Sequence, residues 1–279
     1  MLVLSLYALV LGSGVGSGVV QGSGSSAEQW LAASRDALAE SRYADALEPT
    51  LELTRAFPHQ HVYAERLARI YRHLGQPAQE AAALEQMVGI SPTPIDGCPA
   101  LPEAYVRAGL PARALDAFAR CAAFDPGNTD MLFFLARAQE RAGQAALAAA
   151  GYQAVVALDG THSDSRLGLA RLDLRGGRLE QAEHAARAVL VSFPENVDAL
   201  LIAGVTAQRR GRAADARTYL NRALTVTEGY VDVHIALGIL DFGEGHVSDA
   251  HRHFQRALQL DPARAGEVAQ WLERTREKP

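Results

Sequence analysis

The sequence predicts an all-α protein built from about seven copies of one helix-turn-helix unit. The chain matches itself when it is shifted by 34 residues, and the same glycine returns each time as Gly75, Gly109, Gly143, Gly177, Gly211 and Gly245. Within each unit, apolar and small residues recur at steps of three and four, which is the spacing of an α-helix and not of a strand. We expect each glycine to end one helix in a left-handed turn before a second helix begins.

Two further positions repeat with the glycine. A small residue follows five positions later, as Ala46, Ala114, Ala148, Ala182, Ala216 and Ala250, and a proline closes most units, as Pro58, Pro92, Pro126, Pro194 and Pro262. A small side chain lets two helices cross closely, and a proline cannot continue a helix. This pattern resembles the tetratricopeptide repeat. The resemblance implies a right-handed superhelical solenoid in which the first helix of each unit lines a concave groove.

The period fixes the expected boundaries. The seven units are residues 27–60, 61–94, 95–128, 129–162, 163–196, 197–230 and 231–264. Residues 265–279 are expected to form a capping helix and a tail, because a solenoid needs a polar-faced end to stay soluble.

The third unit carries Pro94, Pro99 and Pro102. We therefore expect a loop or a kink from about Ser91 to Ala100 and a first helix that starts late, near Pro99 or Pro102.

Residues 1–26 differ from the repeats. An apolar run from Leu2 to Leu11 is followed by alternating Gly, Ser and Val, and the first basic residue is Arg35. This composition predicts a secretory signal peptide and hence an exported, periplasmic or envelope-associated protein. A membrane anchor extending to Val20, and a disordered tail or wrong start site with a cytoplasmic protein, are the alternatives. A membrane contact is expected only through this segment, if it is retained.

Composition and motifs give no indication of catalysis. The net charge of −5 does not suggest binding of nucleic acid. The chain has no His-Glu-x-x-His, no Gly-x-Ser-x-Gly elbow and no phosphate-binding loop. We predict no catalytic residue, no cofactor and no metal site, and hence a protein that is not an enzyme.

The two cysteines, Cys98 and Cys121, both fall in the proline-rich third unit. In an antiparallel helix pair they are expected to face each other, so an exported protein could join them in a disulfide that stabilises by about 3 kcal/mol. The alternative is two buried thiols that pack as small apolar side chains.

The groove that the resemblance implies supplies the candidate binding residues. Arginines recur at position 9 of the unit, and position 5 of the same helix is apolar where a polar surface is expected. The candidates are Arg35, Arg69, Phe133, Arg137, Leu167, Arg171, Leu201 and Ile235. A row of arginines can bind the carboxylates of an acidic segment, and an exposed apolar stripe usually marks an interaction site. Some of the stripe could instead be buried by packing between units.

The sequence therefore favours non-catalytic binding of a protein or peptide segment in the groove, and the arginines suit an acidic segment. Such a protein would serve as an adaptor or assembly factor of the cell envelope. Two alternatives stay open: a structural subunit that self-associates, and a non-catalytic partner of a separate enzyme chain.

Overall fold

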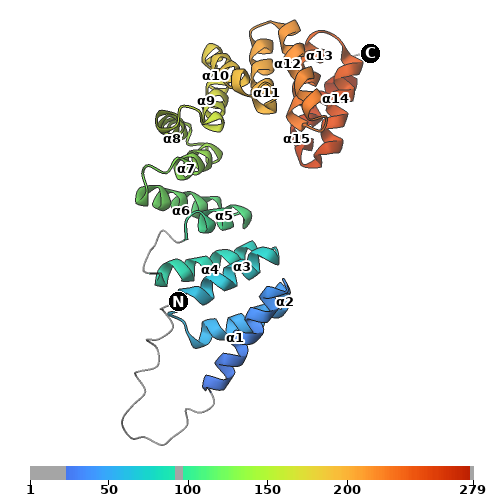
Figure 1. Ribbon diagram of the computed structural model, residues 1–279. Helices are drawn as coiled ribbons and strands as arrows, with labels where there is room; N and C mark the ends of the chain where they lie inside the picture. Colours follow the sequence, from blue (N-terminus) through green and yellow to red (C-terminus); the bar gives the residue numbers. More distant parts are fainter. Residues whose placement is uncertain (1–22, 92–96, 277–279) are drawn as a thin grey trace, which may run out of the picture. The chain divides into compact units, whose positions relative to one another are not determined.

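The computed structural model describes residues 23–91 and 97–276, and the described chain contains fifteen α-helices and no strand (Figure 1). Residues 1–22 of the expected signal segment (residues 1–26) and most of the expected loop after Ser91 lie outside these residues, whereas residues 23–26 belong to α1. The helices are α1 (Ser23–Ala39), α2 (Tyr43–Ala56), α3 (His61–His73), α4 (Pro77–Ile90), α5 (Ala100–Arg107), α6 (Pro111–Phe124), α7 (Thr129–Arg141), α8 (Ala145–Leu158), α9 (Ser163–Arg175), α10 (Leu179–Ser192), α11 (Val197–Arg209), α12 (Ala213–Val226), α13 (Val231–Gly243), α14 (Val247–Leu260) and α15 (Ala265–Arg276). The expected all-α repeat architecture is thus confirmed.

The repeating glycine has the conformation that the sequence predicts. Its backbone φ is positive in all six copies, from 67° at Gly75 to 82° at Gly245. The first repeat has Ser41 at this place, and it adopts the same left-handed conformation with a φ of 56°. For a residue with a Cβ, this left-handed backbone conformation costs roughly 1–2 kcal/mol. The turn geometry is therefore imposed by the packing of α1 against α2, and glycine makes it easier elsewhere.

The prolines mark helix ends without being required there. The helices α6, α10 and α14 end two residues before Pro126, Pro194 and Pro262. The helices α8 and α12 end at the corresponding places, although Gly160 and Glu228 replace the proline. In the third unit, α5 begins at Ala100 directly after Pro99, as the expected late start requires.

The chain divides into two units, residues 1–110 and 111–279, each of which is described by itself. In the first, Ala37, Ala46 and Ile70 form a buried cluster. In the second, a large side chain covers a small residue at two helix crossings: Leu220 packs over Gly204, and Phe254 packs over Gly238. A Cβ on Gly238 would lie 2.6 Å from Cε1 of Phe254. Only glycine allows the two backbones to approach this closely.

The second unit ends with a capping helix. Val268 of α15 is fully buried in a cluster with Ile235, Ala250 and Phe254, and Trp271 stacks on Phe254 with ring centroids 5.7 Å apart. Glu273 and Arg274 of the same helix are exposed, and Arg274 lies over the ring of Trp271 at 5.2 Å. The helix therefore covers the apolar end of the last repeat with a polar face.

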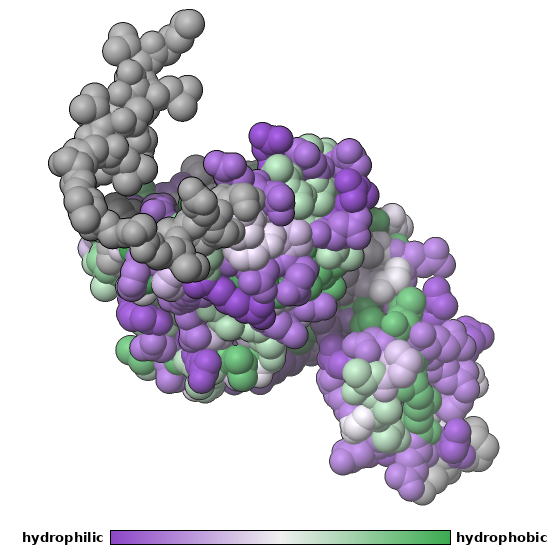
Figure 2. Space-filling model, turned by 90° about the horizontal axis from the view of Figure 1, so that it is seen from below, coloured by the Kyte–Doolittle hydropathy of each residue, from purple (hydrophilic) through white to green (hydrophobic). Residues whose placement is uncertain are grey.

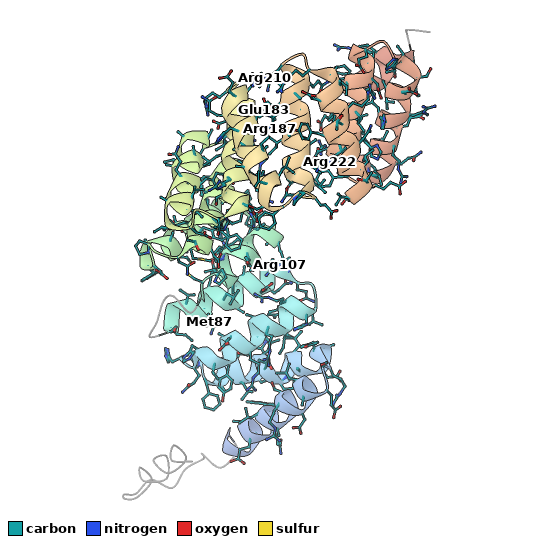
Figure 3. All side chains as sticks on the ribbon, turned by 45° about the horizontal axis from the view of Figure 1, so that its top comes forward. Met87, Arg107, Glu183, Arg187, Arg210 and Arg222 are labelled. Carbon is teal, nitrogen blue, oxygen red and sulfur yellow. The ribbon has the colours of Figure 1, made fainter. Side chains whose placement is uncertain are left out.

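Buried carboxylates join neighbouring repeats. In the first unit, Glu80 is 1% exposed and lies 2.7 Å from Nε of Arg72 and 2.8 Å from Nη2 of Arg107. In the second unit, the buried Glu183 of α10 lies 2.9 Å from Arg187 on its own helix and 2.8 Å from Arg210 at the end of α11 (Figure 3). Each arginine that comes from the next repeat fixes that repeat against its neighbour.

Among the described residues, none of the helices combines the length and apolar character that a membrane span requires. Exposed apolar side chains are interspersed with hydrophilic ones on the face seen in Figure 2.

Candidate functional site

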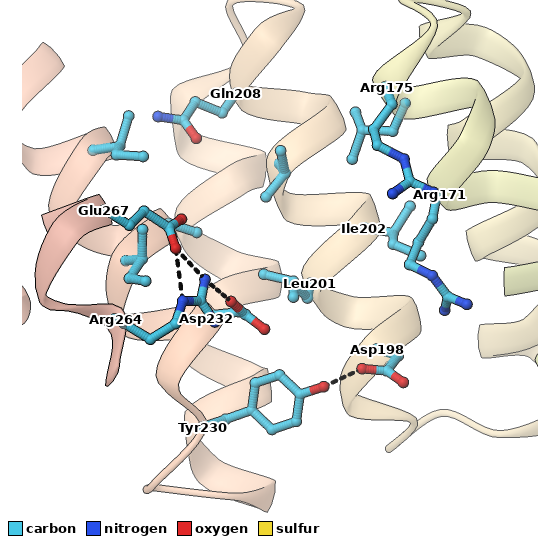
Figure 4. Close-up of a pocket in the computed structure, with 15 residues that line it drawn as sticks. Arg171, Arg175, Asp198, Leu201, Ile202, Gln208, Tyr230, Asp232, Arg264 and Glu267 are labelled. Carbon is cyan, nitrogen blue, oxygen red and sulfur yellow. Dashed lines mark hydrogen bonds and ion pairs between the residues drawn. The ribbon is translucent and has the colours of Figure 1, made fainter. Parts of the chain in front are cut away.

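The second unit contains a cavity of about 790 Å³ that is built from the first helix of each repeat. Helices α9, α11, α13 and α15 supply its lining, and α9 contacts α11, α11 contacts α13 and α13 contacts α15. The lining residues are Arg171, Leu174, Arg175, Asp198, Leu201, Ile202, Val205, Gln208, Tyr230, Asp232, Ile235, Ala236, Ile239, Arg264 and Glu267 (Figure 4). We take this cavity as the candidate binding site.

The middle of the cavity is apolar because two positions of the repeat change character there. Leu201 and Ile235 occupy position 5 in α11 and α13. One turn further along, Val205 and Ile239 stand at the place where earlier repeats carry arginine. Residues four apart share a helix face, so each helix presents two apolar side chains to the cavity.

The wall formed by α9 is basic. Arg171 donates from Nε and Nη2 to Glu140 of α7 at 3.3 Å each, and Arg175 donates to the same carboxylate. Tyr152 also donates to Glu140, at 2.6 Å. Burial alone would raise the pKa of Glu140, but the hydrogen bonds from Arg171 and Tyr152 and the charges of both arginines lower it. Glu140 is therefore ionised near neutral pH and holds the two arginines on this wall.

The opposite wall is acidic. Nη2 of Arg264, in the 3₁₀ turn Pro262–Arg264, lies 2.8 Å from Oδ1 of Asp232, and its Nε donates to Glu267 at 2.6 Å (Figure 4). Burial alone would lower the pKa of Arg264, but its bonds to Asp232 and Glu267 raise it. One guanidinium is thus shared between two carboxylates.

The N-terminal end of α11 contributes a further carboxylate. The hydroxyl of Tyr230 donates a hydrogen bond to Asp198 (Figure 4). Burial raises the pKa of Tyr230 well above its ordinary value, and the bond to Asp198 raises it further. The phenol therefore stays neutral, and its hydroxyl remains a donor to Asp198 at the edge of the cavity.

The structure brings together three of the eight predicted groove residues. Arg171, Leu201 and Ile235 line the cavity. Ile235 is only 6% exposed, so it forms part of the floor. Leu167 does not line the cavity: it is 1% exposed and packs in the core with Ala170 and Ala182, which agrees with the alternative that part of the apolar stripe is buried.

The other predicted residues lie elsewhere. Phe133 and Arg137 form a separate cluster on α7, where Arg137 lies 5.4 Å from the centre of the Phe133 ring and Phe133 packs against Tyr152. In the first unit, Arg69 lines a cavity of about 480 Å³, and Arg35 is exposed and pairs with Asp36 at 3.0 Å. The cavity of about 790 Å³ is therefore not lined by a continuous row of arginines.

Twelve of the fifteen lining residues were not predicted as binding candidates, and five of these are Asp198, Tyr230, Asp232, Arg264 and Glu267. A signal for two of them exists at the last position of the unit. The earlier repeats place Asn128, His162 and Asn196 there, and each caps the next helix by accepting from a backbone N–H. Tyr230 and Arg264 occupy the same position, but they donate instead to an aspartate 32 residues earlier.

The described residues contain one cluster with the spacing of metal ligands: Asp241, Glu244 and His246. Nη2 of Arg217 lies 2.7 Å from Oδ1 of Asp241 and also pairs with Glu244. A guanidinium therefore already supplies the positive charge between these carboxylates, and we interpret the cluster as an ion pair between α12 and α13.

Both cysteines are disulfide-bonded in the structure, and the described chain has no free thiol. The dependence of this bond on an oxidising compartment stays a prediction.

The comparisons with known proteins agree with the fold. A model of the tetratricopeptide repeat matches residues 31–93, 103–163 and 167–229, which together make up more than half of the chain. The chain therefore belongs to the tetratricopeptide repeat family. A search of curated proteins gives no match.

Solved structures with the same fold have low sequence identity. A tetratricopeptide repeat protein from Parabacteroides merdae superimposes with a TM-score of 0.72 at 15% identity, over 90% of this chain and 99% of that one. The Cut9–Hcn1 hetero-tetramer of the APC/C gives 0.65 at 14% identity, over 92% and 57%. YrrB, described as having an unusual peptide-binding site, gives 0.54 at 18% identity, over 67% and 97%. Identities this low establish a common fold and not a common partner.

Proposed function

We propose that this chain is a non-catalytic scaffold that binds an extended segment of a partner protein over the cavity between α9 and α15. The observation that carries the proposal is the cavity itself, with its volume of about 790 Å³, its apolar middle and its charged walls. Binding sites commonly have volumes of about 300–1,000 Å³ and combine an apolar lining with a few polar groups.

The apolar middle supplies the affinity in this proposal. Leu201, Val205, Ile235 and Ile239 offer a surface on which one apolar side chain of the partner can be removed from water. Full burial of a leucine-sized side chain contributes roughly 1.5–3 kcal/mol. A single such anchor corresponds to weak binding, because association also costs the freedom of both partners. We therefore infer a reversible interaction in which several contacts act together.

The family supports a scaffold over an enzyme. Tetratricopeptide repeat proteins are typically non-catalytic scaffolds, and the peptide-binding site named for YrrB belongs to the same fold. We infer that this chain acts as an adaptor or assembly factor.

We further propose that the protein works outside the cytoplasm, in the cell envelope. The apolar run from Leu2 to Leu11 has the composition of a signal peptide, and the disulfide-bonded state of Cys98 and Cys121 suits an oxidising compartment. Sequencing the N-terminus of the mature protein from its native source tests this. An intact Met1 in the isolated protein would contradict cleavage.

Peptide capture by two matched variants tests the binding function. Val205→Arg places a large charged side chain in the cavity, whereas Val226→Arg makes the same change at an exposed residue of α12 outside it. A random peptide library displayed on phage, panned against the parent protein, should yield binders. We expect these peptides to lose at least tenfold in affinity for Val205→Arg and to keep their affinity for Val226→Arg. Equal binding by both variants would place the interaction elsewhere.

A further inference from the structure

The two walls of the cavity carry opposite net charges, and this polarity bears on the chemistry of the partner. On the α9 wall, Arg171 and Arg175 are balanced by one carboxylate, that of Glu140, so two positive charges and one negative leave +1. On the α13 and α15 wall, Arg264 is balanced by Asp232 and Glu267, so one positive charge and two negative leave −1.

Both charges face water and are therefore within reach of a partner. The side chains of Arg171 and Arg175 are 39% and 58% exposed, and those of Asp232 and Glu267 are 46% and 50% exposed. By contrast, the side chain of Glu140 is only 10% exposed, behind the arginines. A partner thus meets guanidinium groups on one side of the cavity and carboxylates on the other.

The carboxylates argue against a partner segment that is acidic throughout. Among the charged lining residues, three arginines stand against three carboxylates, with Asp198 as the third. An aspartate or glutamate placed near Asp232 or Glu267 would meet a like charge, which costs affinity and selects against such partners. The expectation from the arginine row, an acidic partner, therefore suits only the α9 wall.

We infer that the cavity selects a segment of mixed charge, in which an apolar residue stands between an acidic residue and a basic one. The inference rests on the proposed binding function. The acidic residue pairs with Arg171 and Arg175, the apolar residue enters the space between α11 and α13, and the lysine or arginine pairs with Asp232 and Glu267. An arginine fork and a carboxylate form the strongest pairs of this kind.

The spacing of the two charges follows from the helix packing. Neighbouring helices pack about 8–10 Å apart, so α9 and α13, which are separated by α11, are roughly 16–20 Å apart. An extended chain advances about 3.3 Å per residue. The acidic and basic residues of the partner are therefore roughly five to six positions apart, with the apolar residue between them.

Selection from a random twelve-residue peptide library on phage tests the inference, with the full chain as bait. One variant carries Arg171→Gln and Arg175→Gln, and a second carries Asp232→Asn and Glu267→Gln. The second variant is needed because the first removes both arginine partners of the buried Glu140. The matched control replaces two exposed arginines outside the cavity, Arg120→Gln and Arg252→Gln.

We expect the parent and the control to enrich peptides with an apolar residue between opposite charges. The α9 variant should lose the preference for the acidic residue and keep that for the basic one, and the Asp232 and Glu267 variant should show the reverse. Each should bind a parent-selected peptide at least tenfold more weakly. Peptides with charges of one sign, or with no charge preference, would overturn this inference and leave the proposed function standing. Failure to enrich any peptide over a surface without protein would overturn both.

Discussion

Nη2 of Arg264 lies 2.8 Å from Oδ1 of Asp232, a residue in the first helix of the same repeat, and this contact makes the turn before the capping helix part of the cavity wall. The same relationship occurs one repeat earlier, where Tyr230 donates to Asp198 across the same interval of 32 residues. In both cases the residue at the end of a unit does not cap the next helix, and it contacts the aspartate in the first turn of the first helix of its own unit. The C-terminal cap therefore lines the cavity as well as closing the solenoid.

Loss of Arg264 should change binding more than stability. The ion pair with Asp232 is half-exposed, and such pairs contribute about 0–1 kcal/mol. Arg264→Ala should therefore lower the free energy of unfolding, measured in urea, by no more than about 1 kcal/mol. It leaves Asp232 and Glu267 without their cation, so a selected peptide that carries lysine should bind more tightly. Arg256→Ala, on the exposed face of α14, is the control. Weaker binding of the lysine peptide would mean that Arg264 itself receives a carboxylate.

The buried Glu80 predicts an asymmetry between its own loss and the loss of its partners. It occupies the helix crossing where the other repeats have alanine, and Arg72 and Arg107 are 47% and 42% exposed. Glu80→Ala removes a buried charge and lets both arginines return to water, so it should cost about 1 kcal/mol or less.

Removal of both arginines instead leaves a buried carboxylate without a cation. The double variant Arg72→Ala, Arg107→Ala should lose about 3–5 kcal/mol in urea denaturation. If Glu80→Ala is as destabilising as the double variant, the buried carboxylate itself stabilises the folded protein. The explanation by an unpaired buried charge would then be incorrect.

Gly238 should tolerate no side chain. A Cβ there would lie 2.6 Å from Cε1 of Phe254, whereas Gly243 in the same helix has no atom within 4 Å of its Cβ position. Gly238→Ala must displace the buried ring of Phe254 and should cost about 1–3 kcal/mol. Gly243→Ala should be neutral or stabilising by up to about 1 kcal/mol, because alanine favours the helix. Thermal unfolding of the two variants compares them, and equal melting temperatures would contradict the packing seen at Gly238.

His253 should make the stability depend on pH. Burial lowers its pKa, the charge of Asp241 opposes that shift, and the neighbouring His234 adds to it. Because the folded-state pKa lies below the unfolded value of 6.5, the unfolded chain takes up the proton first as the pH falls. The contribution of neutral His253 to the free energy of unfolding is therefore present above pH 6.5. It is lost as the pH falls through the lower pKa of the folded state.

The melting temperature of the parent should thus fall when the pH is lowered from 7 to 5, and His253→Gln should show a smaller fall. His184→Gln, at an exposed site on α10, is the control and should follow the parent. A pH profile of His253→Gln that matches the parent would assign the effect to other groups.

The repeat architecture could be predicted from the sequence because local chemistry determines it. The left-handed turn at Gly75 and its five counterparts, the small residues at the crossings and the late start of α5 after Pro99 all follow from backbone sterics. These features depend on residues within one unit, so a single chain displays them.

The cavity could be predicted only in part, because it depends on contacts between units. Leu167 and Leu201 occupy the same position of the repeat, yet Leu167 is in the core and Leu201 lines the cavity. The difference arises from the neighbouring helices, which no local pattern encodes. Asp198 and Asp232 satisfy the rule for acidic residues in the first turn of a helix, so that rule concealed their second contact with Tyr230 and Arg264.

The most direct test of the account is to locate a bound peptide on the protein by NMR. The chain would be labelled at the methyl groups of isoleucine, leucine and valine and titrated with a peptide selected from the library. The account predicts that resonances of the cavity floor shift, namely those of Leu201, Val205, Ile235 and Ile239, while those of Val191 and Val226 on α10 and α12 stay unchanged. Shifts confined to Val191 and Val226, or to the first unit, would contradict it.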